Sequence, residues 1–84
     1  MKREIYTYRG EWGYRVNYAI HIISGDLIKY FVITHLKPVK KRFKYIINPD
    51  GTATGCSPLF WAQNYKPIKQ KEYYQLLHQR RFDL

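Results

Sequence analysis

The strongest chemical signal in this sequence is a run of positive charge near the middle of the chain. Five cations fall within eight residues: Lys37, Lys40, Lys41, Arg42 and Lys44. Ammonium and guanidinium groups bind phosphate oxygens, and like charges this close repel one another, so we expect an exposed loop that contacts phosphates. The simpler interpretation is a solubilising segment that keeps neighbouring apolar strands from aggregating.

The whole chain repeats this bias. Its 84 residues hold 15 Lys and Arg against 6 Asp and Glu, a formal net charge of +9, together with nine Tyr, four Phe and two Trp. Positive charge attracts polyanions at long range, and aromatic rings offer faces on which bases stack. The composition therefore predicts nucleic acid, either DNA or RNA, as the partner. It fits an acidic protein surface as well, because Tyr, Trp and Arg are enriched at protein-binding hot spots.

Four residues outside the charged run are further binding candidates: Trp12, Arg15, Lys29 and Phe31. Phe31 would serve as a stacking platform, with Arg15 and Lys29 reaching phosphates beside it. The alternative for Phe31 is a place under the C-terminal helix. Trp12 lies between two glycines, so its indole is either displayed to a base or partner surface or folded back over the core.

The acidic and histidine side chains give little reason to expect catalysis. The six carboxylates fall in predicted turns, a loop, the C-terminal helix and the termini, so no pair is placed to act as acid and base. His21 and His35 are expected about 20 Å apart along the sheet, too far to flank one phosphate. His78 with Arg80 and Arg81 could form an endoribonuclease site, but the helix dipole already explains cations near a helix C-terminus. We therefore expect no enzymatic activity.

The chain has a single cysteine, Cys56, which limits the metal sites and disulfides that it could form. One thiol cannot form an internal disulfide, and with three widely spaced histidines it does not assemble a zinc site. We expect a small buried thiol, no metal and no cofactor. No window approaches the roughly 18 apolar residues of a membrane span, and no apolar stretch follows the N-terminus, so we expect a cytoplasmic protein without a membrane partner.

Two apolar runs predict a β-hairpin that would carry these candidates. Residues alternate between apolar and polar from Tyr14 to Ile23, which is typical of a half-buried strand, and a second run covers Leu27–Leu36. Between them, Ser24, Gly25 and Asp26 favour a hairpin loop.

A loop of three residues sets the register of this hairpin. One face then holds the apolar pairs Ile22 with Ile28, Ile20 with Tyr30, Tyr18 with Val32, Val16 with Thr34, and Tyr14 with Leu36. The opposite face holds Arg15 beside His35, Asn17 beside Ile33, Ala19 beside Phe31, and His21 beside Lys29. Because the second face is cationic at both ends and apolar between them, one interpretation is a ligand face. The alternative is that the C-terminal helix covers Phe31 and Ile33, with the charges at its rim.

The remaining segments predict short elements. We expect strands at Ile5–Arg9, Phe43–Ile47 and Thr52–Gly55, a helical turn at Leu59–Asn64 and a C-terminal helix from Ile68 onward. Ser57 is a good N-cap for the helical turn, and Pro58 suits its first position. In the C-terminal helix, Tyr73, Leu76 and Leu77 recur at helical spacing and form an apolar stripe.

Together these elements predict a single α+β domain, residues 1–84, in which strands dominate. We expect a small curved antiparallel sheet or an SH3-like partial barrel of four to five strands, with a short helical turn and a C-terminal amphipathic helix. The order of short basic strands before a terminal helix resembles the small archaeal chromatin proteins, and residues 55–65 are similar to the helical turn before the last strand of SH3-type barrels. Both likenesses concern layout, from which function does not follow.

The sequence thus favours a small basic protein that binds nucleic acid without catalysis, through the Lys/Arg loop and the mixed cationic and aromatic face. The alternative is an inhibitor or accessory protein, of the kind that phages and mobile elements encode, docking on an acidic surface of a larger protein, for example one that itself handles nucleic acid. A third interpretation is an endoribonuclease toxin that uses His78.

Overall fold

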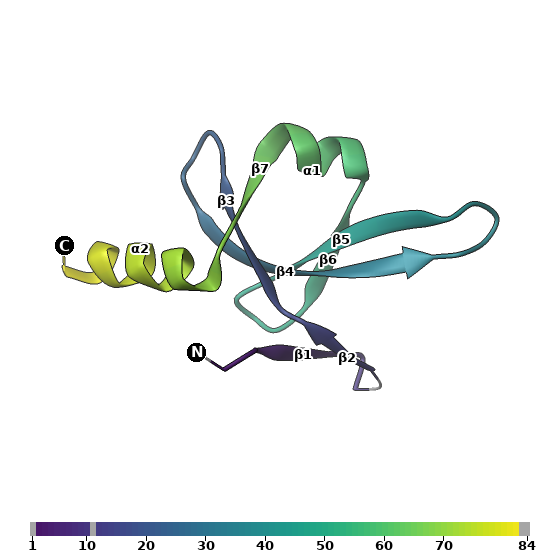
Figure 1. The fold of residues 1–84 in the computed structure, drawn as a ribbon, viewed down its shortest axis with the longest axis horizontal. Helices are drawn as coiled ribbons and strands as arrows, with labels where there is room; N and C mark the ends of the chain where they lie inside the picture. Colours follow the sequence, from purple (N-terminus) through teal and green to yellow (C-terminus); the bar gives the residue numbers. More distant parts are fainter. Residues whose placement is uncertain (1, 11, 83–84) are drawn as a thin grey trace.

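A computed structural model of the chain describes residues 2–10 and 12–82. In chain order, the described residues form β1 (Ile5–Tyr8), β2 (Trp12–Arg15), β3 (Asn17–His21), β4 (Leu27–His35), β5 (Lys41–Ile47), β6 (Ala53–Cys56), α1 (Pro58–Asn64), β7 (Tyr65–Ile68) and α2 (Gln70–Phe82) (Figure 1). The expected class, β-dominated α+β with a short helix and a C-terminal helix, is confirmed.

The strands form two antiparallel sheets. β1 and β2 pair as a hairpin, and the other five strands form one sheet in the order β6-β5-β4-β3-β7. The five-stranded sheet is curved and does not close into a barrel, because its edge strands β6 and β7 do not pair with each other. No helix among the described residues is long and apolar enough to cross a membrane.

Both faces of the five-stranded sheet are covered, as Figure 1 shows with α1 on one side and the β1–β2 hairpin on the other. On the face that the β1–β2 hairpin covers, Tyr73 of α2 packs on Tyr18 of β3, with ring centroids 4.9 Å apart. On the face that α1 covers, Trp61 packs on Tyr30 of β4, with ring centroids 4.3 Å apart. The small core is therefore divided into two clusters, one on each side of the sheet.

The β3–β4 register differs from the expected one by three residues. Ile20 pairs with Leu27 and Tyr18 with Lys29, so Tyr18 and Tyr30 lie on opposite faces. The apolar pairing predicted for a three-residue loop is therefore wrong. Because both faces are covered, β4 is apolar at successive positions, and alternation alone does not select one register.

The β3–β4 turn is longer than three residues because a histidine holds it together. The Nδ1 atom of His21 accepts hydrogen bonds from the backbone N–H groups of Ile23 and Ser24, at 3.3 and 3.1 Å. The carbonyl of His21 accepts a third from Gly25, which adopts a φ of +77°. These contacts assign His21 to the turn and take it out of the expected ligand face.

The strand expected from Tyr14 to Ile23 is divided near Val16. Its first part, β2, pairs with β1, and its second part, β3, enters the five-stranded sheet. The backbone N–H of Val16 donates to the carbonyl of Glu4 at 2.9 Å, which holds the N-terminal segment against the division. This division lets the β1–β2 hairpin fold back over the sheet.

The segment after the short helix contains a strand that the sequence did not predict. β7 pairs antiparallel with β3, with Pro67 opposite Ala19, and α2 starts at Gln70 instead of Ile68. Proline is tolerated here because β7 is an edge strand, where one side of the backbone needs no partner. The short helix itself is confirmed: the hydroxyl of Ser57 accepts a hydrogen bond from the N–H of Phe60, and Pro58 is the first helical residue.

Candidate nucleic-acid interface

The most prominent surface feature is a two-stranded arm formed by residues 32–44, hereafter the arm. Its strands continue β4 and β5 beyond the body of the sheet, as the protruding hairpin in Figure 1 shows. The pairs are Val32 with Lys44, Ile33 with Phe43, Thr34 with Arg42 and His35 with Lys41. The expected charged loop is thus shorter than the sequence indicated, because β5 begins at Lys41 and not at Phe43.

The arm displays its charges on both faces and at its tip. Successive strand residues point to opposite faces, so Lys41 lies on one face and Arg42 on the other. Lys37 and Lys40 flank the tip, and these four cations are exposed. Lys44 is half-buried, with its Nζ 5.6 Å from the centroid of the Trp61 ring, so a cation-π contact holds it against α1.

None of the arm cations forms an ion pair with an acidic residue that the structure describes. Among the described residues, the ion pair joins Lys29 to Glu4, with Nζ and Oε2 3.0 Å apart. Although burial disfavours the charged ammonium, the hydrogen bond to Glu4 raises the pKa of Lys29. Lys29 was expected to reach phosphates, but its charge is already neutralised within the fold. Lys29 therefore contributes little to the positive potential of the surface, whereas the arm cations contribute to it.

Glu4 is held ionised by its neighbours. Its carboxylate accepts hydrogen bonds from the hydroxyls of Tyr18 and Tyr74 and from the Lys29 ammonium. Burial opposes the charge, yet these donors together bring the pKa of Glu4 below its ordinary value.

Two other carboxylates, those of Glu11 and Asp83, lie outside the described residues. The expectation that no two carboxylates act together as acid and base is therefore untested for them.

Phe31 is fully buried, with 0% of its surface exposed, and presents no ring face to a ligand. It lies under the β1–β2 hairpin, where it stacks on Tyr6 and Tyr14 with both centroids at 5.1 Å. On its own sheet it stacks on Tyr45, at 5.3 Å. The stacking role expected for Phe31 is therefore wrong, and the cover is supplied by a hairpin and not by the C-terminal helix.

Exposed and half-buried rings lie instead at the base of the arm and along one of its faces. Trp12 is 68% exposed, so its indole is displayed and not folded over the core. It pairs across the hairpin with Tyr8, whose ring lies 5.9 Å from Tyr45 of β5. Four other residues of this surface were not predicted from the sequence: Tyr8, His35, Phe43 and Tyr45. The alternation of Lys41, Phe43 and Tyr45 in β5 was the available signal.

Arg15 is exposed at the end of β2, apart from the arm. It lines a hollow of about 480 Å³ together with two other cations, Arg3 and Lys69. The expected pair of Arg15 with His35 is wrong, because Arg15 pairs with Ile5 and His35 with Lys41. The structure therefore does not bring Arg15, Lys29 and Phe31 together as one ligand face.

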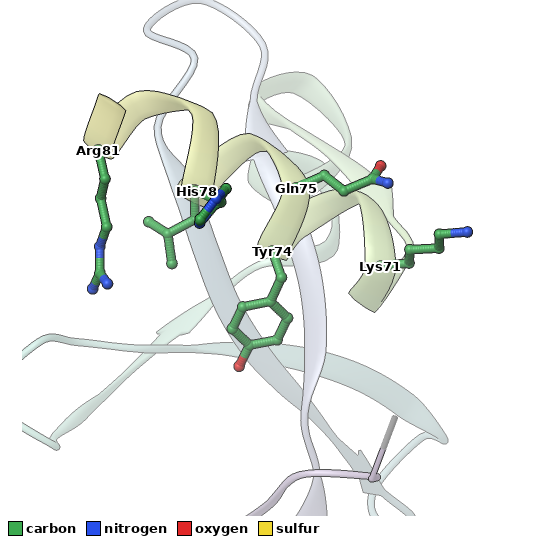
Figure 2. A pocket seen from close by; sticks show the side chains of 6 residues that line it. Lys71, Tyr74, Gln75, His78 and Arg81 are labelled. Atoms are coloured by element: carbon green, nitrogen blue, oxygen red, sulfur yellow. The ribbon is translucent and has the colours of Figure 1, made fainter. Parts of the chain in front are cut away.

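A second hollow, about 450 Å³ in volume, follows one side of α2 (Figure 2). Its lining residues are Lys71, Tyr74, Gln75, Leu77, His78 and Arg81. His78 and Arg81 thus share a hollow, but Arg80 points elsewhere, since its guanidinium donates to the carbonyl of Gly25 at 2.7 Å. The three residues considered for a ribonuclease site are not brought together.

Cys56 is buried, as expected, and burial raises the pKa of its thiol. A raised pKa keeps the thiol protonated and weakly nucleophilic. Within residues 2–10 and 12–82, no three His, Cys, Asp or Glu side chains gather where a metal ion could be held.

Comparison of the chain with protein-family models, with curated proteins and with solved structures finds no match in any of the three.

Proposed function

We propose that this protein binds nucleic acid without catalysis, and that the arm is its main contact with phosphates. The supporting observation is the concentration of exposed cations on a protruding hairpin, with no described carboxylate paired to any of them. An isolated set of like charges destabilises the fold through repulsion. A bound polyanion relieves this repulsion, and the cations in turn replace and release its condensed counterions.

The shape of the arm agrees with this role. A hairpin that carries charge on both faces contacts phosphates on either side of itself when it lies along a nucleic acid. Lys37, Lys40, Lys41 and Arg42 supply this contact, and Lys44, held against Trp61, adds charge at the base.

The test is the salt dependence of binding. Each neutralised phosphate contributes about −0.7 to −0.9 to the slope of log affinity against log salt concentration. Removing three arm cations in the variant K40A/K41A/R42A should weaken binding and reduce the steepness of this slope by about 2 to 3. Fluorescence anisotropy with labelled DNA and RNA oligonucleotides, from low to physiological salt, measures both quantities.

A control of equal charge is available outside the arm. The variant K66A/K69A/K71A removes three exposed cations from β7, from α2 and from the residue between them, and should change the slope by less than about 1. Equal effects of the two variants would show that the charge acts diffusely and that the arm is not the site. Absence of binding to any DNA or RNA at low salt would end the proposal.

A second candidate function has one observation in its favour. Leu36 and Val39 at the arm tip are 71% and 60% exposed, and apolar side chains among cations suit a pocket on an acidic protein surface. An inhibitor or accessory protein of this kind would keep a protein partner in a pull-down from nuclease-treated lysate, whereas a nucleic-acid-binding protein would lose most of its associated material. A cytoplasmic setting, in which a free thiol stays reduced, belongs to both proposals.

A further inference from the structure

Aromatic rings beside the arm form a series in which Trp12 and His35 are exposed and Tyr8, Phe43 and Tyr45 are half-buried. Trp12 pairs with Tyr8 across the β1–β2 hairpin, and Tyr8 packs against Tyr45 of β5 at 5.9 Å. Figure 1 shows the β1–β2 hairpin beneath the part of the sheet from which the arm extends. The indole therefore lies at the base of the arm, on the face of the sheet that carries Tyr45.

The series continues along that face of the arm. Phe43 lies two residues from Tyr45 in β5, so both side chains point to the same side. His35 packs edge-on against Phe43 at 5.1 Å, and its Nε2 lies 3.4 Å from the hydroxyl oxygen of Tyr45. We call the five residues Trp12, Tyr8, Tyr45, Phe43 and His35 the aromatic strip.

Cations stand at both ends of the strip. The guanidinium carbon of Arg9 lies 5.1 Å from the centroid of the Tyr8 ring, next to Trp12. At the other end, Lys41 pairs with His35 and shares its face. Neither cation has an ion-pair partner among the described residues. A row of rings between two positive charges matches the way in which proteins hold bases by stacking and the backbone by charge.

We infer that the aromatic strip binds single-stranded nucleic acid, with unpaired bases stacked on Trp12 and Phe43 and the backbone phosphates held by Arg9 and Lys41. The inference rests on the proposed function and names its substrate class. In a duplex, each base is already stacked between its neighbours and shows only its edges in the grooves. Exposed ring faces gain most from bases that are free to leave the stack.

Binding to a duplex is the competing outcome. The major groove admits a two-stranded ribbon, so the arm could lie there and contact phosphates on both sides. That mode uses the arm cations and leaves the indole of Trp12 without a role. The two modes therefore differ in whether the rings contribute to affinity.

Trp12 supplies the signal for the test, because the other tryptophan, Trp61, is only 4% exposed. Stacking of a base on Trp12 should quench tryptophan fluorescence and the quenching should disappear in W12F. The probes are oligothymidylate and oligouridylate of about 12 nucleotides and a duplex of the same length, all at the same salt concentration. We expect quenching by the single strands and at least about fivefold tighter binding of one of them than of the duplex.

Two strip variants and one control complete the experiment. W12A and F43L each remove a ring, and each should weaken single-strand binding by about 5-fold or more. F43L keeps an apolar side chain at a half-buried position, so it preserves the fold. F60A is the control, since Phe60 is 49% exposed but lies on α1, on the opposite face of the sheet, and its removal should change affinity by less than 2-fold.

The results separate the inference from the function on which it rests. Tight binding of the duplex that is weakened by K40A/K41A/R42A but not by W12A or F43L would overturn the role of the aromatic strip and keep that of the arm. Equal losses from F60A and W12A would also overturn it, because they would show a general effect of aromatic surface. If no nucleic acid binds at low salt, the proposed function fails and the strip fails with it.

Discussion

The ammonium of Lys29 and the carboxylate of Glu4 form an ion pair, 3.0 Å between Nζ and Oε2, that joins the N-terminal segment to the middle of the sheet. The other carboxylate oxygen accepts hydrogen bonds from Tyr18 of β3 and Tyr74 of α2. One partly buried carboxylate therefore ties four parts of the fold together. In a chain of 84 residues, with a core divided between two faces, such a junction is a large share of the total stability.

Replacing Glu4 with glutamine should destabilise the protein by about 2 kcal/mol at neutral pH, because hydrogen bonds to an ionised acceptor are lost. The folded-state pKa of Glu4 is lowered, so its contribution is complete above the unfolded-state pKa of about 4.3 and is lost as the pH falls through the lower, folded-state pKa. The stability curves of wild type and E4Q should converge in acid. Urea unfolding between about pH 2 and pH 7 measures this. The control E72Q, at an exposed position of α2, should run parallel to wild type; a gap between wild type and E4Q that persists in acid would contradict the prediction.

Replacing Tyr18 with phenylalanine should change how the stability of the protein depends on pH in alkaline solution. Burial and the hydrogen bond to Glu4 raise the pKa of Tyr18 well above its ordinary value of about 10. Its contribution is therefore complete below pH 10 and is lost as the pH rises, since the unfolded tyrosine ionises first. Wild type should lose stability above about pH 10 more steeply than Y18F. A double-mutant cycle with E4Q should give a coupling of about 1 kcal/mol between the two side chains, and additive effects would show that the hydroxyl and the carboxylate do not interact.

Replacing Phe31 with alanine should cost about 3 to 5 kcal/mol, because the ring is fully buried beneath the β1–β2 hairpin. F31L keeps more of the contact and should fold with a smaller loss. The same truncation at exposed Phe60 should cost less than about 1 kcal/mol. Urea midpoints of the three variants measure the difference. In folded F31L, the affinity for nucleic acid should equal that of wild type; a loss of affinity would return Phe31 to the binding surface.

Several secondary-structure elements could be predicted from the sequence because interactions between neighbouring residues determine them. Ser57 and Pro58 determine the start of α1, since a hydroxyl cap and a proline without an N–H satisfy the first turn of any helix. The strand nature of β1, β4 and β5 follows from residues that favour extended backbone. Cys56 was correctly expected to be a buried thiol.

The tertiary structure decided how those elements face one another. Phe31 and Tyr30 are adjacent in β4 and both are buried, one under the β1–β2 hairpin and the other under α1. An alternating pattern identifies one buried face, but two covered faces make either register acceptable to the apolar residues alone. The turn contacts of His21 selected the register that formed.

For the candidate surface, the sequence by itself determined the charge, since the arm cations lie within eight residues and the 15 Lys and Arg of the chain outnumber its six carboxylates. Only the tertiary structure decided which aromatic rings are exposed to solvent. Composition treats every tyrosine, phenylalanine and tryptophan alike, whereas packing buries Phe31 and leaves Trp12 exposed. The physical reason is that burial depends on contacts between residues distant in sequence, and those contacts form only when the hairpin and helices close over the sheet.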